Sequence, residues 1–595
     1  MNLLASASQR LFAGLVILGM LSIMNVIHAE PAEADAALEA FFRNYLDESF
    51  RLRPLDATRL GDHRFDDRVD DVSAAARQRW LEHQRQMLAE LPREIDYRQL
   101  SRNSQIDYEM LRQELTRGIW LAENTHPFEE DPRVYGDTVN DSTYSLLLQS
   151  TLPRETNVAN CLARLPQLPT VLDEARRALK HPPRVVVETA IRQNRGAIAY
   201  YDHDLAALAG DSPRRDELQK AARPVVEALR RHQQFLEDEL LPQATGDWRL
   251  STEKFSRKLE LVLDAGLSAD EVLAGAEAEK ARVRAEMFTV ASRLWPRYFP
   301  QTSPPADDER GRAETIARVL AEIGHEHGDP AALVDDARAT VDRIRRFITE
   351  RDVLRLPEPD RCRIIEMPAF RRGNSLAYLD AALPLDPQGT SFYAISPPPA
   401  DWGPQQVRSF LEEYNRHMLV VLTIHEAYPG HYVQLEYSNR NPSLIRRVLQ
   451  SGVFIEGWAV YCEQMMLDAG YGADDPALRL SQLKFYLRTV VNAILDHRMH
   501  CDGITDDEAF ALLTEEAFQS AGEARLKIIR AKQSSVQLST YFVGRMAMRR
   551  LRDEIEREQG TSFNLGRFHE AVLAHGSVPV KYLGELVRRR LNEPR

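Results

Sequence analysis

Apolar residues recur at intervals of three and four along most of this chain, which has 595 residues. This spacing places them on one face of an α-helix. The same stretches are rich in Ala, Leu, Glu and Arg, which are good helix formers. The clearest of them are Ala36–Phe50, Ala74–Leu91, Asn103–Leu121, Arg214–Leu241, Ala269–Leu294 and Pro330–Arg351. The sequence therefore predicts a mostly α-helical protein.

Strand-like segments are few. Arg363–Met367 and Ser391–Ile395 are short β-branched or aromatic runs with Pro or Gly nearby, which is typical of strands. Breaker residues cluster at 300–311 and 397–404, which predicts loops there. We therefore expect one small β-sheet in an otherwise helical fold.

The composition fits a folded protein with a large core, since 44% of the residues are hydrophobic and 28% are charged. The formal net charge of −13 argues against a nucleic-acid partner, which needs a broad basic surface. We expect a large two-lobed molecule, with an N-terminal helical lobe at residues 30–304 and a second helical lobe at residues 305–595. Both lobes are expected to form one continuous domain.

The N-terminus has the pattern of a secretory signal peptide over residues 1–29. Arg10 precedes an apolar run, Leu11–Ile27, and Ala29 offers a small residue at the cleavage position. The alternative is an uncleaved membrane anchor, for which 17 residues is short. No cysteine follows the run closely, so a lipid-modified cysteine is not expected there. We expect an exported protein, periplasmic or extracellular, without stable membrane insertion after cleavage.

The four cysteines lie far apart and form no C-x-x-C pair, which argues against a thiolate metal site. They are Cys161, Cys362, Cys462 and Cys501. Burial as small hydrophobic residues is the favoured interpretation, and the pairing of the last two stays open.

Two histidines with an adjacent glutamate suggest a hydrolytic zinc site, although their spacing is unusual. In H-E-x-x-H the histidines are four residues apart and share one helix face. His425 and His431 are six apart, so an ideal helix would place them on faces roughly 120° away from each other. Either the helix breaks between them and brings His431 back, or both are ordinary histidines near a helix end.

A break is expected at Pro429. The segment Gln405–Tyr428 reads as one helix, and a residue that precedes a proline is pushed away from helical dihedrals. Gly430 can then adopt dihedrals that other residues avoid. The Pro429–Gly430 pair therefore favours the metal interpretation.

A third ligand is predicted in the helix Ser451–Leu467, whose surroundings are strongly apolar. An unpaired carboxylate of Glu456 in such surroundings is costly, and a metal ion relieves the cost. Two histidines and one glutamate, with water in the fourth position, form a recognised catalytic zinc site. Glu463 shares the face of Glu456 and is either an acceptor that orients a ligand histidine or the partner of an arginine.

Glu426 is the predicted general base. In H-E-x-x-H enzymes the glutamate beside the first histidine takes a proton from the attacking water. The same role suits Glu426, which would then deliver the proton to the leaving amine. The lobe at residues 305–595 is therefore the expected catalytic lobe, with the small β-sheet near its active site.

Two further residues are predicted to stabilise the transition state. Asp496 and His500 are four apart on a predicted helix, Leu480–His500, so the carboxylate can hold the imidazole tautomer. His500 would donate a hydrogen bond to the developing oxyanion. Tyr541 offers a phenol donor for the same oxyanion, although a helical tyrosine is more often part of the core.

At these residues the chain resembles a bacterial family known as domain of unknown function 885, and it looks like a member of the wider group of gluzincin-like zinc peptidases. The main matches are HEAYPGH at 425–431, EGWAVYCE at 456–463, the Asp496–His500 pair and STYFVG at 539–544. Weaker matches lie at 54–73 and 575–579. The resemblance thus covers most of the chain.

This resemblance implies a helical fold and assigns His425, His431 and Glu456 to one Zn²⁺ ion and Glu426 to catalysis. It also supports His500 and Tyr541 as transition-state stabilisers. The family often carries a second histidine directly after the PGH triplet, where this chain has Tyr432. We interpret His431 as the ligand and Tyr432 as a harmless replacement.

The expected function is that of an exported zinc-dependent metallopeptidase that hydrolyses short peptides. One alternative is a zinc-dependent hydrolase of a non-standard amide, such as a cell-wall peptide or an acyl-amino acid. Another is a non-catalytic zinc-binding protein, although a structural zinc site usually has four protein ligands and only three candidates are visible. The sequence leaves the oligomeric state open.

Overall fold

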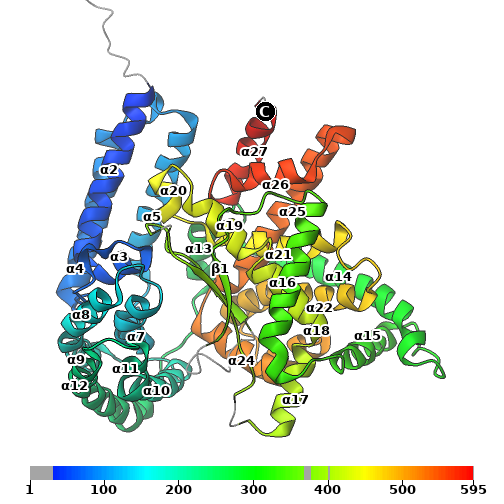
Figure 1. Cartoon of the computed structure of the whole chain (residues 1–595), viewed down its shortest axis with the longest axis horizontal. Coiled ribbons are helices and arrows are strands. Elements are labelled where there is room, and N and C mark those ends of the chain that lie inside the picture. Colours follow the sequence, from blue (N-terminus) through cyan, green and yellow to red (C-terminus); the bar gives the residue numbers. More distant parts are fainter. Residues whose placement is uncertain (1–30, 368–376, 387, 400–401, 594–595) are drawn as a thin grey trace, which may run out of the picture.

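The computed structural model describes residues 31–367, 377–386, 388–399 and 402–593. These residues form many packed helices and one three-stranded sheet, so the predicted fold class is confirmed (Figure 1). The expected signal peptide, residues 1–29, lies outside the described residues. Within the described part of the chain, no helix combines the length and the apolar character needed to cross a bilayer.

Two of the N-terminal helices begin at serine caps. α4 (Ala74–Glu94) follows Ser73, and α5 (Arg102–Asn124) follows Ser101; each serine hydroxyl accepts a hydrogen bond from a backbone N–H of the first turn. Both helices lie beside α2 (Pro31–Leu52) in Figure 1. The first three predicted helices are therefore present, with ends a few residues beyond the predicted ones.

A second helical cluster follows and has a hydrophobic core of its own. Its members lie together below α2 and α4 in Figure 1. The helices of this region are α6 (Pro127–Glu130), α7 (Arg133–Leu148), α8 (Arg154–Arg164), α9 (Leu168–Ala178), α10 (Arg184–Ala199), α11 (Leu205–Leu208) and α12 (Arg215–Gln234), whereas α3 (Pro54–Leu60) contributes Ala57 to the larger core.

The larger core joins α2, α4 and α5 to the helices that follow residue 250. α14 (Ala269–Tyr298) lies before the predicted lobe boundary at residue 304 and packs along α22 (Pro476–His497), which lies beyond it. The two helices therefore share a core across the predicted lobe boundary. The boundary itself stays a prediction. The other helices of this core are α13 (Thr252–Leu263), α15 (Glu309–Gly324), α16 (Leu333–Glu350), α20 (Leu444–Val448), α23 (Asp506–Ala511), α24 (Ala521–Gln533), α26 (Leu565–Leu573) and α27 (Leu583–Asn592).

The sheet has the strand order β1–β3–β2. β1 (Cys362–Glu366) is parallel to β3 (Ser391–Ile395), and β2 (Ala377–Asp380) is antiparallel to it. Cys362 lies opposite Ser391, and Ala377 lies opposite Ile395. Both predicted strands are confirmed, while the edge strand β2 was not predicted.

The predicted single helix Gln405–Tyr428 is wrong, because the chain forms two helices there. α17 spans Pro404–Glu413 and α18 spans Arg416–Glu426. Between them, the side-chain oxygen of Asn415 accepts a hydrogen bond from the His417 N–H at 3.0 Å. An asparagine that binds the backbone in this way starts a new helix.

α18 packs against the sheet. The hydroxyl groups of Tyr393 in β3 and Thr423 in α18 lie 3.0 Å apart and form a buried hydrogen bond. This contact fixes the last turn of α18 on the central strand.

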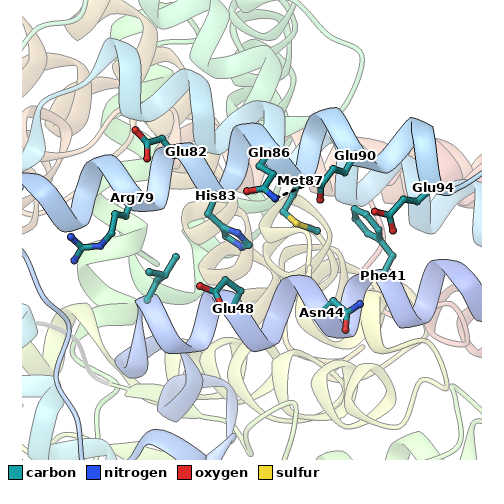
Figure 2. A pocket seen from close by; sticks show the side chains of 11 residues that line it. Phe41, Asn44, Glu48, Arg79, Glu82, His83, Gln86, Met87, Glu90 and Glu94 are labelled. Atoms are coloured by element: carbon teal, nitrogen blue, oxygen red, sulfur yellow. Dashed lines mark hydrogen bonds between the residues drawn. The ribbon is translucent and has the colours of Figure 1, made fainter.

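A surface cavity of about 460 Å³ lies between α2 and α4 (Figure 2). Asn44 and Glu48 from α2 and His83 and Met87 from α4 line it. None of the residues predicted for the zinc site lines this cavity. All four cysteines are free thiols, and Cys161 and Cys462 are buried as expected.

Candidate metal centre

α18 ends where the sequence predicts a break. His425 and Glu426 are its last two residues, and the next helix, α19 (His431–Asn439), begins at His431. Residues 427–430 form the turn between the two helices. The two histidines thus lie on different helices. Their six-residue spacing therefore does not place them on different faces of one helix.

Gly430 is required in this turn for reasons of space. A Cβ atom at this position would lie 1.9 Å from the His425 carbonyl oxygen and 2.3 Å from that of Ile424. Its φ of −69° is ordinary, so close approach of the backbone, and not a left-handed conformation, excludes other residues. The turn is also held from outside, because the Trp458 indole N–H donates to the Pro429 carbonyl at 2.8 Å.

His425, His431 and Glu456 converge. The Nε2 atoms of His425 and His431 lie 3.8 Å and 3.4 Å from Glu456 Oε2. The centroids of the two imidazole rings are 4.7 Å apart. One ligand atom from each residue lies within 4.8 Å of the others, so a single ion can contact all three. Glu456 lies on α21 (Gly452–Asp468), which matches the predicted helix Ser451–Leu467 to within one residue at each end.

The side chain of Glu463 orients the first histidine. Its Oε1 lies 2.7 Å from His425 Nδ1, and its side chain is fully buried. With Nδ1–H donating to Glu463, His425 Nε2 is left with its lone pair toward Glu456. Of the two contacts considered for Glu463, the one with His425, a predicted ligand, is present, and its role in a metal site stays a prediction.

The charges in this cluster favour a metal ion. Burial, together with the neighbouring His431, lowers the pKa of His425 to about 3, so this ring is neutral as a ligand must be. Burial acts to raise the pKa of Glu456, but the nearby His431, His425 and Tyr541 together outweigh it and the pKa falls. Glu456 is therefore an anion between two imidazoles.

The donor set fits zinc. Glu456 Oε2 is buried and has no hydrogen-bond partner among the residues that the structure describes. Such an oxygen is costly unless a cation or donor compensates it. Two imidazole nitrogens and one carboxylate oxygen are the protein ligands of catalytic zinc sites, which keep a fourth position open.

Glu426 lies beside this cluster. The charges of His431 and Glu456 both act on it, and the nearby backbone of Leu379 in β2 acts to lower its pKa. Burial raises the pKa of Glu426 to about 7. A carboxylate with a pKa near neutrality can both accept and return a proton.

Tyr541 also reaches the cluster. It lies in the first turn of α25 (Thr540–Gln559), and its hydrogen bond is among the interactions that lower the pKa of Glu456. Its hydroxyl oxygen accepts hydrogen bonds from Arg530 at 3.2 Å and from Gln537 at 3.3 Å. The structure therefore places Tyr541 next to the predicted ligands.

Two glycines bring Tyr541 to this position by letting α21 and α25 touch. A Cβ atom at Gly457 would lie 2.4 Å from the Gly544 backbone, and one at Gly544 would lie 2.0 Å from the Val453 carbonyl oxygen. Gly457 follows Glu456 directly, and Gly544 is one turn beyond Tyr541. The contact between the helix backbones thus fixes the distance between the two functional side chains.

Gly457→Ala is expected to lower the free energy of unfolding by about 1–3 kcal/mol, because the added methyl group overpacks this contact. Gly452→Ala on the same helix is the matched control, since its nearest neighbour atom, Thr540 Cγ2, is 3.9 Å away. Urea unfolding of both variants measures the difference. Equal stability of the two would show that the helix contact is not tight.

The predicted role of His500 is wrong. Both of its ring nitrogens bind the backbone: Nε2–H donates to the carbonyls of Ala531 and Ser534 at 3.2 Å and 3.0 Å, and Nδ1 accepts from the Leu250 N–H at 3.3 Å. Its ring also stacks on Phe255. His500 therefore joins three chain segments and has no free N–H for an oxyanion.

The predicted pairing of Asp496 with His500 is also wrong. The Asp496 carboxylate accepts hydrogen bonds from the Val536 N–H at 3.0 Å, the Ser539 N–H at 3.1 Å and the Ser539 hydroxyl at 2.8 Å. These groups belong to the segment just before α25. Asp496 thus anchors the start of the helix that carries Tyr541.

Tyr432 lies outside the cluster. Its ring is fully buried, and its hydroxyl accepts from the Arg361 N–H at 2.8 Å and donates to Asp360 at 2.9 Å. These partners precede β1, so Tyr432 helps to hold the sheet. The replacement of a histidine at this position leaves the His431 contacts described above in place.

Comparison with known proteins supports the family but no activity. The family model of a bacterial protein of unknown function, DUF885, matches residues 54–587. No curated protein matches the chain. A solved structure of a candidate lipoprotein of unknown function from Shewanella oneidensis has a TM-score of 0.78 and 29% identity and covers 94% of this chain and 100% of its own.

A candidate lipoprotein from Colwellia psychrerythraea shares the fold as well, with a TM-score of 0.77, 17% identity and the same coverage of both chains. The family model spans nearly all of the described residues and includes every residue of the His425–His431–Glu456 cluster. The chain belongs to the DUF885 family of bacterial proteins of unknown function.

Proposed function

We propose that the protein is a zinc-dependent metallopeptidase that acts on short peptides. The observation that carries the proposal is the convergence of His425, His431 and Glu456, with Glu463 fixing the tautomer of the first histidine. Glu426 beside this cluster and Tyr541 across from it supply the groups that peptide hydrolysis needs.

His425, His431 and Glu456 would hold a zinc ion, which would supply Lewis acidity to polarise the scissile carbonyl and make water a stronger acid. Glu426 accepts the proton of the attacking water and returns it to the leaving amine.

Tyr541 acts as the electrophilic partner. Its hydroxyl oxygen accepts from Arg530 and Gln537, so its own proton is left for an acceptor: Glu456 in this structure, and the reacting carbonyl oxygen when Glu456 holds the metal. A donor placed where negative charge develops stabilises the transition state more than the ground state. Tyr541 therefore takes over the role that the sequence predicted for two residues, Tyr541 and His500.

We also propose that the protein is exported. The signal-like residues 1–29 and the description of both similar structures as candidate lipoproteins support this location. In this chain the first cysteine is Cys161, so a lipid anchor at a cysteine close to the signal is not part of the proposal.

Metal removal tests the proposed activity. Wild-type protein is treated with a chelator, and hydrolysis of blocked and unblocked short peptides is followed by mass spectrometry before and after zinc is restored. We expect hydrolysis to disappear with the metal and to return with one equivalent of zinc. Cleavage that survives complete removal of the metal would contradict a zinc peptidase, and restored hydrolysis of acyl-amino acids alone would favour the other amide substrates.

A further inference from the structure

Helix α24, near the candidate metal centre, carries a buried lysine, Lys527. Glu523, Lys527 and Arg530 lie four and three residues apart on this helix, so they share one face. Lys527 is only 4% exposed. Its ammonium group makes no hydrogen bond or ion pair with any residue that the structure describes.

The charges around Lys527 do not balance. Arg488 of α22 and Arg530 are close enough to act on it as like charges, and Glu523 is the one nearby carboxylate that opposes them. Glu523 already accepts from the Tyr414 hydroxyl at 3.2 Å and pairs with Arg488 at 3.5 Å. Lys527, Arg488 and Arg530 are here called the cation cluster. Glu413 also acts on Arg488, but it pairs with Lys484 at 3.0 Å, so Lys527 itself has two cations and one shared carboxylate around it.

The cation cluster borders the metal centre through two contacts. Arg530 donates to the Tyr541 hydroxyl, which in turn interacts with Glu456. On the other side, the Arg488 guanidinium lies 5.5 Å from the Phe485 ring centroid, and that ring is 6.0 Å from the His425 ring. One side chain therefore separates the cluster from each of two predicted ligands: Tyr541 from Glu456, and Phe485 from His425.

A buried ammonium group without a partner is costly, and the protein retains this one beside two other cations. Burial, Arg488 and Arg530 all lower the pKa of Lys527, and a bound anion would offset each of these effects. An arginine guanidinium also matches a carboxylate by donating two parallel hydrogen bonds. These features are typical of a site that binds an anion, such as the carboxylate of a bound molecule.

Resting on the proposed peptidase function, we propose that the cation cluster binds the free C-terminal carboxylate of the peptide substrate. Arg530 bridges this site to Tyr541, so a peptide held there has its scissile bond near its C-terminal end. The substrate class is therefore short peptides with an unblocked C-terminus.

The test measures binding separately from hydrolysis. N-acetyl-trialanine and its C-terminal amide are titrated by calorimetry into full-length, zinc-loaded protein with the Glu426→Gln substitution, which prevents turnover. We expect the free acid to bind at least tenfold more tightly than the amide. Adding Lys527→Met should remove this preference and leave amide binding unchanged, because the amide carries no charge at that end.

Lys532→Met is the matched control, since Lys532 lies on the same helix but pairs with Asp506, outside the cluster. It should keep the preference for the acid. Equal affinity of acid and amide, or no measurable binding of the acid, would overturn the proposal even if Lys527→Met fails to fold.

Hydrolysis by the wild-type protein separates the two proposals. Equal cleavage of acid and amide would overturn the C-terminal site and leave the peptidase intact. Tighter binding of the acid without cleavage of either peptide would support the site and contradict the peptidase.

Discussion

Replacing Glu426 with glutamine is expected to lower kcat for peptide hydrolysis by about 100- to 10,000-fold, the range that a general acid–base group supplies. Glutamine keeps the size of the side chain but accepts no proton. The zinc content should stay at one ion per chain, because Glu426 is beside the ligands and not among them. Steady-state kinetics and elemental analysis of the same preparation measure both quantities.

Glu436→Gln is the matched control for this substitution. Glu436 is a buried carboxylate on α19 that pairs with Arg440, away from the predicted ligands. Its variant should keep kcat within a few-fold, which separates loss of the base from loss of any buried charge. Full activity of Glu426→Gln would contradict its catalytic role, and loss of zinc from that variant would make Glu426 a ligand.

Replacing Glu456 with glutamine is expected to weaken zinc binding by more than about 100-fold and to abolish hydrolysis at limiting zinc. Glu456 is the only anion among the three predicted ligands, and its Oε2 lies within 3.8 Å of both imidazole nitrogens. Loss of an outer partner of a metal ligand costs about 10- to 100-fold in affinity, and loss of the ligand itself costs more. Competition titration with a zinc-binding dye measures the affinity.

Glu463→Gln gives an internal scale for this measurement, because Glu463 contacts His425 and not the ion. The expected order of affinity loss is Glu456→Gln, then Glu463→Gln, then Glu436→Gln. Unchanged zinc affinity in Glu456→Gln would remove Glu456 from the ligand set.

Local sequence signals predicted the cluster well. Pro429 and Gly430 indicated a helix break between two histidines, and the structure has that break because a side chain at 430 would collide with the His425 carbonyl. The apolar surroundings of Glu456 indicated a buried carboxylate that needs compensation. Both inferences depend on short-range chemistry, which a single sequence contains.

Local sequence signals could not predict contacts between segments that are far apart in the chain. Asp496 and His500 share a helix face, but the partners that they bind lie on chain segments far away in sequence, at Leu250 and at residues 531–539. The strand near Glu426, β2, is too short to be recognised by its pattern. Nothing in the sequence alone shows which segments meet.

Some of the missed residues nevertheless carry a recognisable signal. A buried indole N–H needs an acceptor, which makes Trp458 a candidate for a structural contact, and its acceptor is the Pro429 carbonyl. Gly457 beside the predicted ligand Glu456 similarly indicates a close backbone approach. The sequence offers no comparable signal for the Leu379 backbone near Glu426.

The position of the ion is the most direct test of the zinc centre. Crystals of zinc-loaded protein are measured on both sides of the zinc absorption edge, and anomalous difference maps are compared. We expect one peak per chain, about 2.0–2.2 Å from the Nε2 atoms of His425 and His431 and from a carboxylate oxygen of Glu456. No peak at these residues, or a peak held by other side chains, would contradict the zinc centre and the peptidase function built on it.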